Sequence, residues 1–148
     1  MAAVLRYLNQ DESWQEYERE QGKHIIRAYA LKTERVRLDA TTASSHIEPS
    51  EDGLFQLGHS KDHRPDLAQV KIMLASLDPL GLALATQVVA GNYASDPLYE
   101  PAIEQVRRTL NQEGILYVGD CKMAASKTRA GIEKSHDYYL MPLPATIK

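Results

Sequence analysis

Residues 114–120 read GILYVGD, a run of four apolar residues between two glycines. An apolar run without polar alternation is typical of a strand buried on both faces of a sheet. A helical pattern precedes it and opens at Pro97 or Pro101, because proline suits the first helical position. A weaker helical pattern follows over Met123–Glu133, with Gly131 as an interruption. Strands that alternate with helices indicate parallel pairing with right-handed crossovers.

Further strands are expected on both sides of this region. Four stretches have the composition of strands: Val36–Ala40, Val70–Leu77, Leu82–Ala90 and Tyr138–Met141. The middle two form a predicted hairpin, because Asp78–Gly81 between them has the Pro and Gly spacing of a tight turn. We expect the Thr- and Ser-rich residues 41–45 to leave the sheet. Leu54–Leu57 could add a short strand to the loop-rich stretch 46–66.

The sequence therefore predicts an α/β fold with a mixed five-stranded sheet, in the order β-β-β-α-β-α-β. A helix over residues 11–31 precedes the sheet, because apolar side chains such as Trp14 and Ile25 recur there at helical spacing. We divide the chain into an N-terminal helical segment or linker, residues 1–33, and a core, residues 34–148.

Composition narrows the possible functions. The chain has 148 residues and a formal charge of −3, from 17 basic and 20 acidic residues. This length suits one domain, and DNA contact by a slightly acidic chain would need local basic patches. One cysteine excludes a disulfide scaffold and fits a reducing cytoplasm. No apolar stretch approaches the roughly 18 residues of a membrane span, and no signal-peptide pattern opens the chain.

Two carboxylates follow predicted strands. Asp39 comes after Val-Arg-Leu, and Asp120 comes after Ile-Leu-Tyr-Val-Gly. If their strands are parallel neighbours, both side chains lie at one edge of the sheet, where ligands of α/β sheets gather. Two close carboxylates repel, and a divalent cation such as Mg²⁺ removes that conflict. The alternative is structural, because an aspartate after a strand often forms a turn or caps a helix, as Asp120 could do near Lys122.

Three short stretches of sequence give a further indication of fold and function. They are LDATT (residues 38–42), GHSKDHRPDL (residues 58–67) and YVGDCKM (residues 117–123). The order of elements, with aspartates on the first and fourth strands, resembles the ribonuclease-H-like fold. The local sequences resemble those of DDE transposases of bacterial insertion sequences, over roughly residues 34–143. The middle stretch is the most specific of the three.

The resemblance implies metal-assisted phosphoryl transfer during DNA transposition. Asp39 and Asp120 would be the first two catalytic carboxylates and would hold Mg²⁺ or Mn²⁺. The family's third acidic residue, a Glu on a later helix, has no counterpart, since Glu133 precedes the last strand. We therefore expect an incomplete and inactive portion of a transposase core. Its partners would be double-stranded DNA (transposon ends and target) and a second copy or an intact transposase. It would lie in a bacterial cytoplasm near the nucleoid and away from membranes.

Several basic residues are candidates for contact with DNA phosphates: Lys61, His63, Arg64, Lys122, Lys127 and Arg129. Solvated loop or helix surfaces explain them equally simply. Other functions also stay open at this point. The chain could bind DNA or an intact transposase without catalysis and inhibit it, or it could be a remnant without a role. A nuclease of another kind that works with only two carboxylates is a further alternative.

Overall fold

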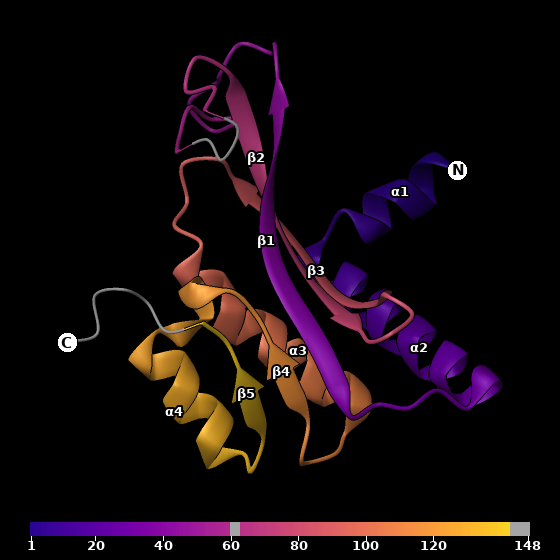
Figure 1. Cartoon of the computed structure of the whole chain (residues 1–148). Helices are drawn as coiled ribbons and strands as arrows, with labels where there is room; N and C mark the ends of the chain where they lie inside the picture. The colour runs from indigo at the N-terminus through magenta and orange to yellow at the C-terminus, as the bar shows by residue number, and fades with distance from the viewer. Residues whose placement is uncertain (60–62, 143–148) are drawn as a thin grey trace.

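A computed structural model describes residues 1–59 and 63–142, and a five-stranded sheet is its centre (Figure 1). The strands are β1 (Arg35–Ser45), β2 (Ala68–Leu77), β3 (Leu82–Ala90), β4 (Leu116–Val118) and β5 (Tyr138–Leu140). Their spatial order is β3-β2-β1-β4-β5, so the longest strand lies in the middle. β1, β2 and β3 pair antiparallel, whereas β1, β4 and β5 pair parallel. The predicted α/β class and mixed sheet are confirmed.

Helices fill the connections and precede the sheet. They are α1 (Ala2–Leu8), α2 (Asp11–Tyr29), α3 (Tyr99–Leu110) and α4 (Ser126–Lys134), with 3-10 turns η1 (Asp96–Leu98) and η2 (Cys121–Ala124). α2 and α3 pack against each other and against the antiparallel strands. α3 and α4 are the crossovers of the parallel half, as the alternation of strands and helices predicted. Over the described ranges, no helix combines the length and the apolar content that crossing a bilayer requires.

Strand β1 separates two environments by its alternation. Val36, Leu38 and Ala40 are at most 2% exposed and join the core, whereas Arg37 and Asp39 are exposed. Successive side chains of a strand point to opposite faces, which explains the alternation. Burial of the apolar set on one face against helices stabilises the sheet, because apolar surface leaves water. Asp39 therefore belongs to the face opposite the core.

Two local predictions were wrong over several residues. Residues 41–45 do not leave the sheet, because β1 continues to Ser45 and pairs with β2 from Thr41↔Ile72 to Ser45↔Ala68. The long partner strand offers backbone hydrogen bonds that outweigh the turn tendency of Thr and Ser, and Thr is itself a good strand former. The predicted helix Met123–Glu133 is divided at Ala125 into η2 and α4.

The other local errors are small. Gly131 lies within α4 and does not interrupt it. The stretch Leu54–Leu57 forms a single bridge, Gln56↔Gln69, rather than a strand.

Helix α2 is attached to the core by a buried carboxylate. Glu18 is 6% exposed, and its Oε2 accepts hydrogen bonds from the Thr86 backbone N–H (2.9 Å) and from Gln105 Nε2 (3.0 Å). Gly22 lets α2 approach closely, since a Cβ there would lie 3.3 Å from Thr109 Cγ2. α2 thus packs on β3 and α3, and the division at residues 33 and 34 stays a prediction.

Candidate functional site

The parallel pair β1–β4 positions the two aspartates. Its register runs from Arg35↔Leu116 to Arg37↔Val118. Asp39 is the second residue after Arg37, and Asp120 is the second residue after Val118. The prediction that Asp39 follows the end of its strand was wrong, because β1 continues to Ser45, whereas Asp120 does follow the end of β4. If the register is carried two residues beyond its last pair, the two aspartates come to the same level.

One oxygen of Asp120 already has two donors. Asp120 Oδ1 accepts hydrogen bonds from the Tyr99 hydroxyl (2.7 Å) and from the Lys122 backbone N–H (2.8 Å). The second of these makes Asp120 the N-cap of η2, so the structural role considered for this residue is present. Within residues 1–59 and 63–142, Asp120 Oδ2 accepts no hydrogen bond. Capping thus uses one oxygen and leaves the other for a ligand.

The charges of three aspartates reach the Tyr99 hydroxyl. Tyr99 is fully buried, and burial raises the pKa of its hydroxyl well above the ordinary value. The hydrogen bond to Asp120 and the negative charges of Asp120, Asp39 and Asp96 raise this pKa further. The hydroxyl therefore stays protonated and donates at any physiological pH. Because Asp39 and Asp120 both act on one hydroxyl, their carboxylates share one electrostatic neighbourhood.

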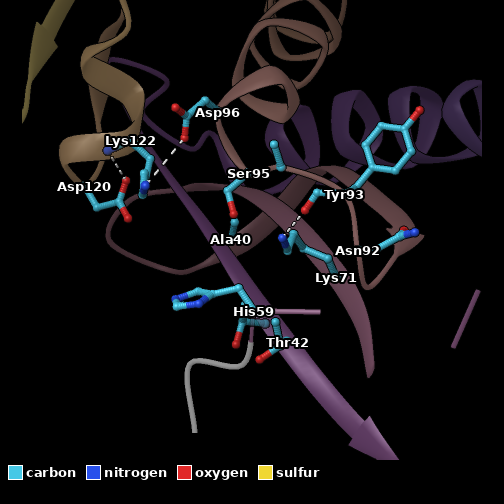
Figure 2. A pocket seen from close by; sticks show the side chains of 12 residues that line it. Ala40, Thr42, His59, Lys71, Asn92, Tyr93, Ser95, Asp96, Asp120 and Lys122 are labelled. Atoms are coloured by element: carbon cyan, nitrogen blue, oxygen red, sulfur yellow. Dashed lines mark hydrogen bonds and ion pairs between the residues drawn. The ribbon is translucent and has the colours of Figure 1, made fainter. Parts of the chain in front are cut away.

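A cavity of about 460 Å³ opens beside Asp120 (Figure 2). Its lining comes from β1, the connection between β1 and β2, β2, the loop that leads into η1, and the start of η2: Ala40, Thr41, Thr42, His59, Lys71, Asn92, Tyr93, Ala94, Ser95, Asp96, Asp120 and Lys122. Both cationic and anionic groups face this space. Such a mixed lining suits a ligand that has phosphate groups and brings metal ions, since each charge then finds a partner.

Two lysines of the cavity are fixed by oxygen atoms. Lys71, on β2, is 6% exposed, and its Nζ donates a hydrogen bond to the Tyr93 carbonyl oxygen (Figure 2). Lys122 Nζ lies 4.0 Å from Asp96 Oδ1 and is more exposed. The buried lysine is thus tied to the loop before η1, while Lys122 stands at the rim beside Asp120.

The residues present fit one kind of metal site. Carboxylate oxygens are the ligands that Mg²⁺ prefers, and this ion needs only one or two protein carboxylates when phosphates and water complete its shell. Asp39 on β1 and Asp120 after β4 supply two carboxylates, and the charges of both act on the Tyr99 hydroxyl. Among the residues whose positions are described, no three His, Cys, Asp or Glu side chains gather as a metal cluster. The donor set therefore fits an open site with two carboxylates, and not a site closed by protein ligands.

The loop candidates for DNA contact lie on exposed chain. Lys61 falls outside the described residues. His63 is exposed and has a left-handed backbone, with φ of 56°. Arg64 forms a two-pronged ion pair with Asp66, Nε to Oδ1 at 2.9 Å and Nη2 to Oδ2 at 2.7 Å. This pair offsets the charge of Arg64, so contact with DNA at this loop stays a prediction.

The candidates after β4 lie at different distances from the cavity. Lys122 lines it, whereas Lys127 forms an ion pair with Glu100 (2.7 Å) at the start of α3. Arg129, on α4, has a buried Nε atom that finds no hydrogen-bond partner in the described part of the chain. Of these three residues Lys122 lies next to Asp120, and contact with DNA stays a prediction for all three.

The arrangement was compared with known proteins. No protein-family model matches the chain, and no curated protein matches it. The solved catalytic domain of Mos1 mariner transposase matches with a TM-score of 0.50 and 12% identity, over 93% of this chain and 64% of that chain. A piggyBac transposase synaptic complex with hairpin DNA matches with a TM-score of 0.53 and 11% identity, over 94% of this chain and 31% of that chain.

The fold is ribonuclease-H-like. This confirms the fold that the order of elements and the strand-end aspartates had suggested. The chain spans less than two thirds of the length of both solved transposase chains. At these identities the likeness concerns the fold, so the chemistry of the site has to be argued from its own residues.

Sequence reasoning missed Tyr99 as a site residue. The helical spacing of Tyr99 with Ile103, Val106 and Leu110 predicts only the apolar face of a helix. In the structure the first three are buried, and Leu110 is partly buried against the core. The available signal was chemical, since a buried tyrosine needs a partner for its hydroxyl. Which partner it would find depended on how α3 packs beside the end of β4, and the sequence did not specify that.

Proposed function

We propose that this chain belongs to the catalytic core of a transposase that cuts and joins DNA strands by metal-assisted phosphoryl transfer. The observation that supports this most directly is the parallel pairing of β1, which carries Asp39, with β4, which Asp120 follows by two residues. The ribonuclease-H-like fold and the cavity beside Asp120 support it further. We propose an insertion sequence of a bacterium as its source and DNA of transposon ends and targets as its substrate.

Asp39 and Asp120 would hold Mg²⁺ or Mn²⁺ through carboxylate oxygens, with Asp120 using the oxygen that is not bound to Tyr99. When bound, such ions activate a water or hydroxyl and stabilise the leaving oxygen of a phosphodiester. Lys122, at the rim of the cavity, would offset phosphate charge next to the carboxylates. The Tyr93 carbonyl oxygen accepts a hydrogen bond from Lys71, and Asp96 lies near Lys122, so each cavity lysine has an oxygen partner.

Metal binding tests the site directly. We expect the purified chain to bind Mn²⁺, as measured by the loss of the free-ion signal in electron paramagnetic resonance. Asp39→Asn and Asp120→Asn should each weaken binding by at least about tenfold, because each removes one charged ligand of an ion with few protein ligands. Asp66→Asn is the matched control, since Asp66 is an exposed aspartate in an ion pair with Arg64. Unchanged Mn²⁺ affinity in both site variants would refute the assignment.

Strand cleavage tests the reaction. With Mg²⁺ and supercoiled DNA, we expect little or no nicking by this chain alone, because the described residues supply two carboxylates and no group of three potential ligands. Robust nicking that persists in Asp39→Asn and Asp120→Asn would place the chemistry elsewhere.

The lack of a third acidic ligand in the described ranges also favours a second function. A core with two carboxylates could bind DNA or an intact transposase and inhibit transposition without cutting. We propose this as the alternative, with either a second copy or an intact transposase as partner. Co-expression with a complete transposase distinguishes the two, since an inhibitor lowers the frequency of transposition and an inert chain leaves it unchanged.

A further inference from the structure

Tyr99 is a polar residue in an apolar position. It is the first residue of α3 and is completely buried, and the helix places it on one face with Ile103 and Val106. Phenylalanine would fill the same space with the same rotamer and without a polar atom to satisfy. Packing alone therefore does not require the hydroxyl, and the partner that the hydroxyl binds indicates its role.

The hydroxyl is directed at one oxygen of one carboxylate. It donates to Asp120 Oδ1 at 2.7 Å, and the Lys122 backbone N–H donates to the same oxygen at 2.8 Å. Two donors that come from different elements, α3 and the start of η2, fix the rotation of a carboxylate about its side-chain bonds. Of these donors only the hydroxyl comes from outside the loop of Asp120 itself. The group bound to Oδ1 thereby determines where Oδ2 lies.

The resulting orientation of the Asp120 carboxylate suits ligand binding. Asp120 lines the cavity, and within the described ranges its Oδ2 has no hydrogen-bond donor (Figure 2). Asp39, the second carboxylate, lies on β1, the parallel neighbour of β4, and its negative charge also acts on the Tyr99 hydroxyl. Partners behind a ligating carboxylate hold it in the orientation that an ion requires, and their removal lowers affinity without removing a ligand.

We propose that Tyr99 is a positioning residue that holds Asp120 in the orientation for binding a divalent cation together with Asp39. This inference rests on the proposed function. Tyr99 touches neither the ion nor the DNA, and it acts through Asp120 alone. The proposal predicts that removal of the Tyr99 hydroxyl lowers metal affinity and changes packing little.

The matched pair of variants is Tyr99→Phe and Tyr117→Phe. Both tyrosines are fully buried, but Tyr117 is on β4 and its hydroxyl has no hydrogen-bond partner in the described part of the chain. We expect Tyr99→Phe to weaken Mn²⁺ binding about tenfold, the range found when a group behind a metal ligand is removed. Tyr117→Phe should bind Mn²⁺ like the wild type. Urea unfolding of both variants without metal gives their stabilities, and a crystal structure of Tyr99→Phe shows the rotamer of Asp120.

The outcomes separate this inference from the proposed function. If Asp120→Asn loses Mn²⁺ and Tyr99→Phe keeps wild-type affinity, the positioning role is wrong and the metal site stands. If the wild type binds no Mn²⁺, or Asp120→Asn binds as well as the wild type, the metal site is wrong and the positioning role falls with it. If Tyr99→Phe and Tyr117→Phe lose affinity equally, general loosening of the core explains the effect and the specific role is refuted.

Discussion

Asp120 and Asp137 lie near opposite ends of β4, and their carboxylates have different surroundings. Asp137 has a side chain that is 1% exposed, and both of its oxygens are in use: Oδ1 accepts from the Ile115 backbone N–H (2.9 Å), and Oδ2 accepts from Arg107 Nε (3.0 Å). Asp120 is half-buried, and both of its donors use Oδ1. Asp137 forms an ion pair with the Arg107 guanidinium, whereas Asp120 accepts hydrogen bonds only from neutral donors, the Tyr99 hydroxyl and the Lys122 backbone N–H, in the described part of the chain.

The difference indicates what each carboxylate does. A buried charge whose partners are all provided by the fold stabilises the fold, and nothing is left for a ligand. A carboxylate that is oriented by neutral donors keeps its negative charge uncompensated, which attracts a cation. Asp137 therefore joins α3 to the parallel half of the sheet, and Asp120 is suited to ligand binding.

The largest expected effect tests the structural member of this pair. Asp137→Asn keeps an oxygen for the Ile115 N–H but leaves the Arg107 guanidinium without its charge partner. We expect a loss of about 3 kcal/mol in the free energy of unfolding, at the lower end for breaking a buried ion pair because Arg107 retains some exposure. Urea denaturation measures this loss.

Its matched control is Glu104→Gln, because Glu104 forms an exposed ion pair with Arg108 at 3.3 Å on the same helix. We expect a change of about 0.5 kcal/mol or less there. Mn²⁺ affinity should be unchanged in both variants when they are folded. A stability loss of equal size in the two variants would contradict the structural role of Asp137.

A third carboxylate, Glu18, tests whether a single open oxygen is sufficient for metal binding. Both of its donors use Oε2, as both donors of Asp120 use Oδ1, but Glu18 lies on α2, which packs on β3 and α3, and not at the parallel strands β1 and β4. Glu18→Gln should lower the free energy of unfolding by about 2 kcal/mol, since hydrogen bonds to a charged acceptor join α2 to the core. Mn²⁺ affinity should stay at the wild-type value, and Glu16→Gln, an exposed neighbour, should change neither quantity. A fall in affinity in Glu18→Gln would refute the requirement for paired carboxylates.

The parallel pairing of the strands that carry or precede the two candidate aspartates was predictable from the sequence, whereas the position of Asp39 within β1 was not. The apolar run before Asp120 indicated a buried strand, and the alternation of strands and helices indicated parallel pairing. Both inferences depend on the pattern of apolar residues along short stretches of the chain, and this pattern can be read directly from the sequence. The length of β1 was not predictable in the same way, because residues 41–45 are held in the sheet by their long partner β2 rather than by their own tendencies.

Partners of individual polar atoms were less predictable. That Tyr99 binds Asp120 and that Arg107 binds Asp137 follows from how α3 crosses the sheet, and each pair joins residues more than 20 positions apart. Sequence patterns indicate which face of a helix is buried but not which atom lies opposite. The strands near the candidate metal ligands could thus be predicted, whereas the groups that orient or stabilise carboxylates could not.

A substitution at Gly119 tests how closely the position of Asp120 depends on the packing of the preceding residue against Met123. A Cβ at Gly119 would lie 2.8 Å from Met123 Sδ, and Met123 is fully buried. Gly119→Ala should therefore cost about 1 kcal/mol in the free energy of unfolding and displace the neighbouring Asp120, which lowers Mn²⁺ affinity. Gly131→Ala is the matched control. It meets no atom within 4 Å inside α4 and should stabilise the chain by about 0.5 kcal/mol. Equal stabilities and affinities in the two variants would contradict the close packing at Gly119.

The smallest expected effect concerns Asp66, an aspartate with a charged partner but full exposure. The hydrogen bond from Arg64 lowers the pKa of Asp66 to about 2. Because this folded-state pKa lies below the unfolded value, the ion pair favours folding at neutral pH and loses its contribution as the pH falls through about 2. Exposure to solvent makes that contribution too small to detect by unfolding.

The side-chain carboxyl signal of Asp66 in a nuclear magnetic resonance titration reports this pKa instead. Arg64→Gln should raise the midpoint, and Arg108→Gln should leave it unchanged. A wild-type midpoint in the ordinary range of aspartate would show that a charged partner at the surface does not hold its carboxylate as Arg107 holds Asp137.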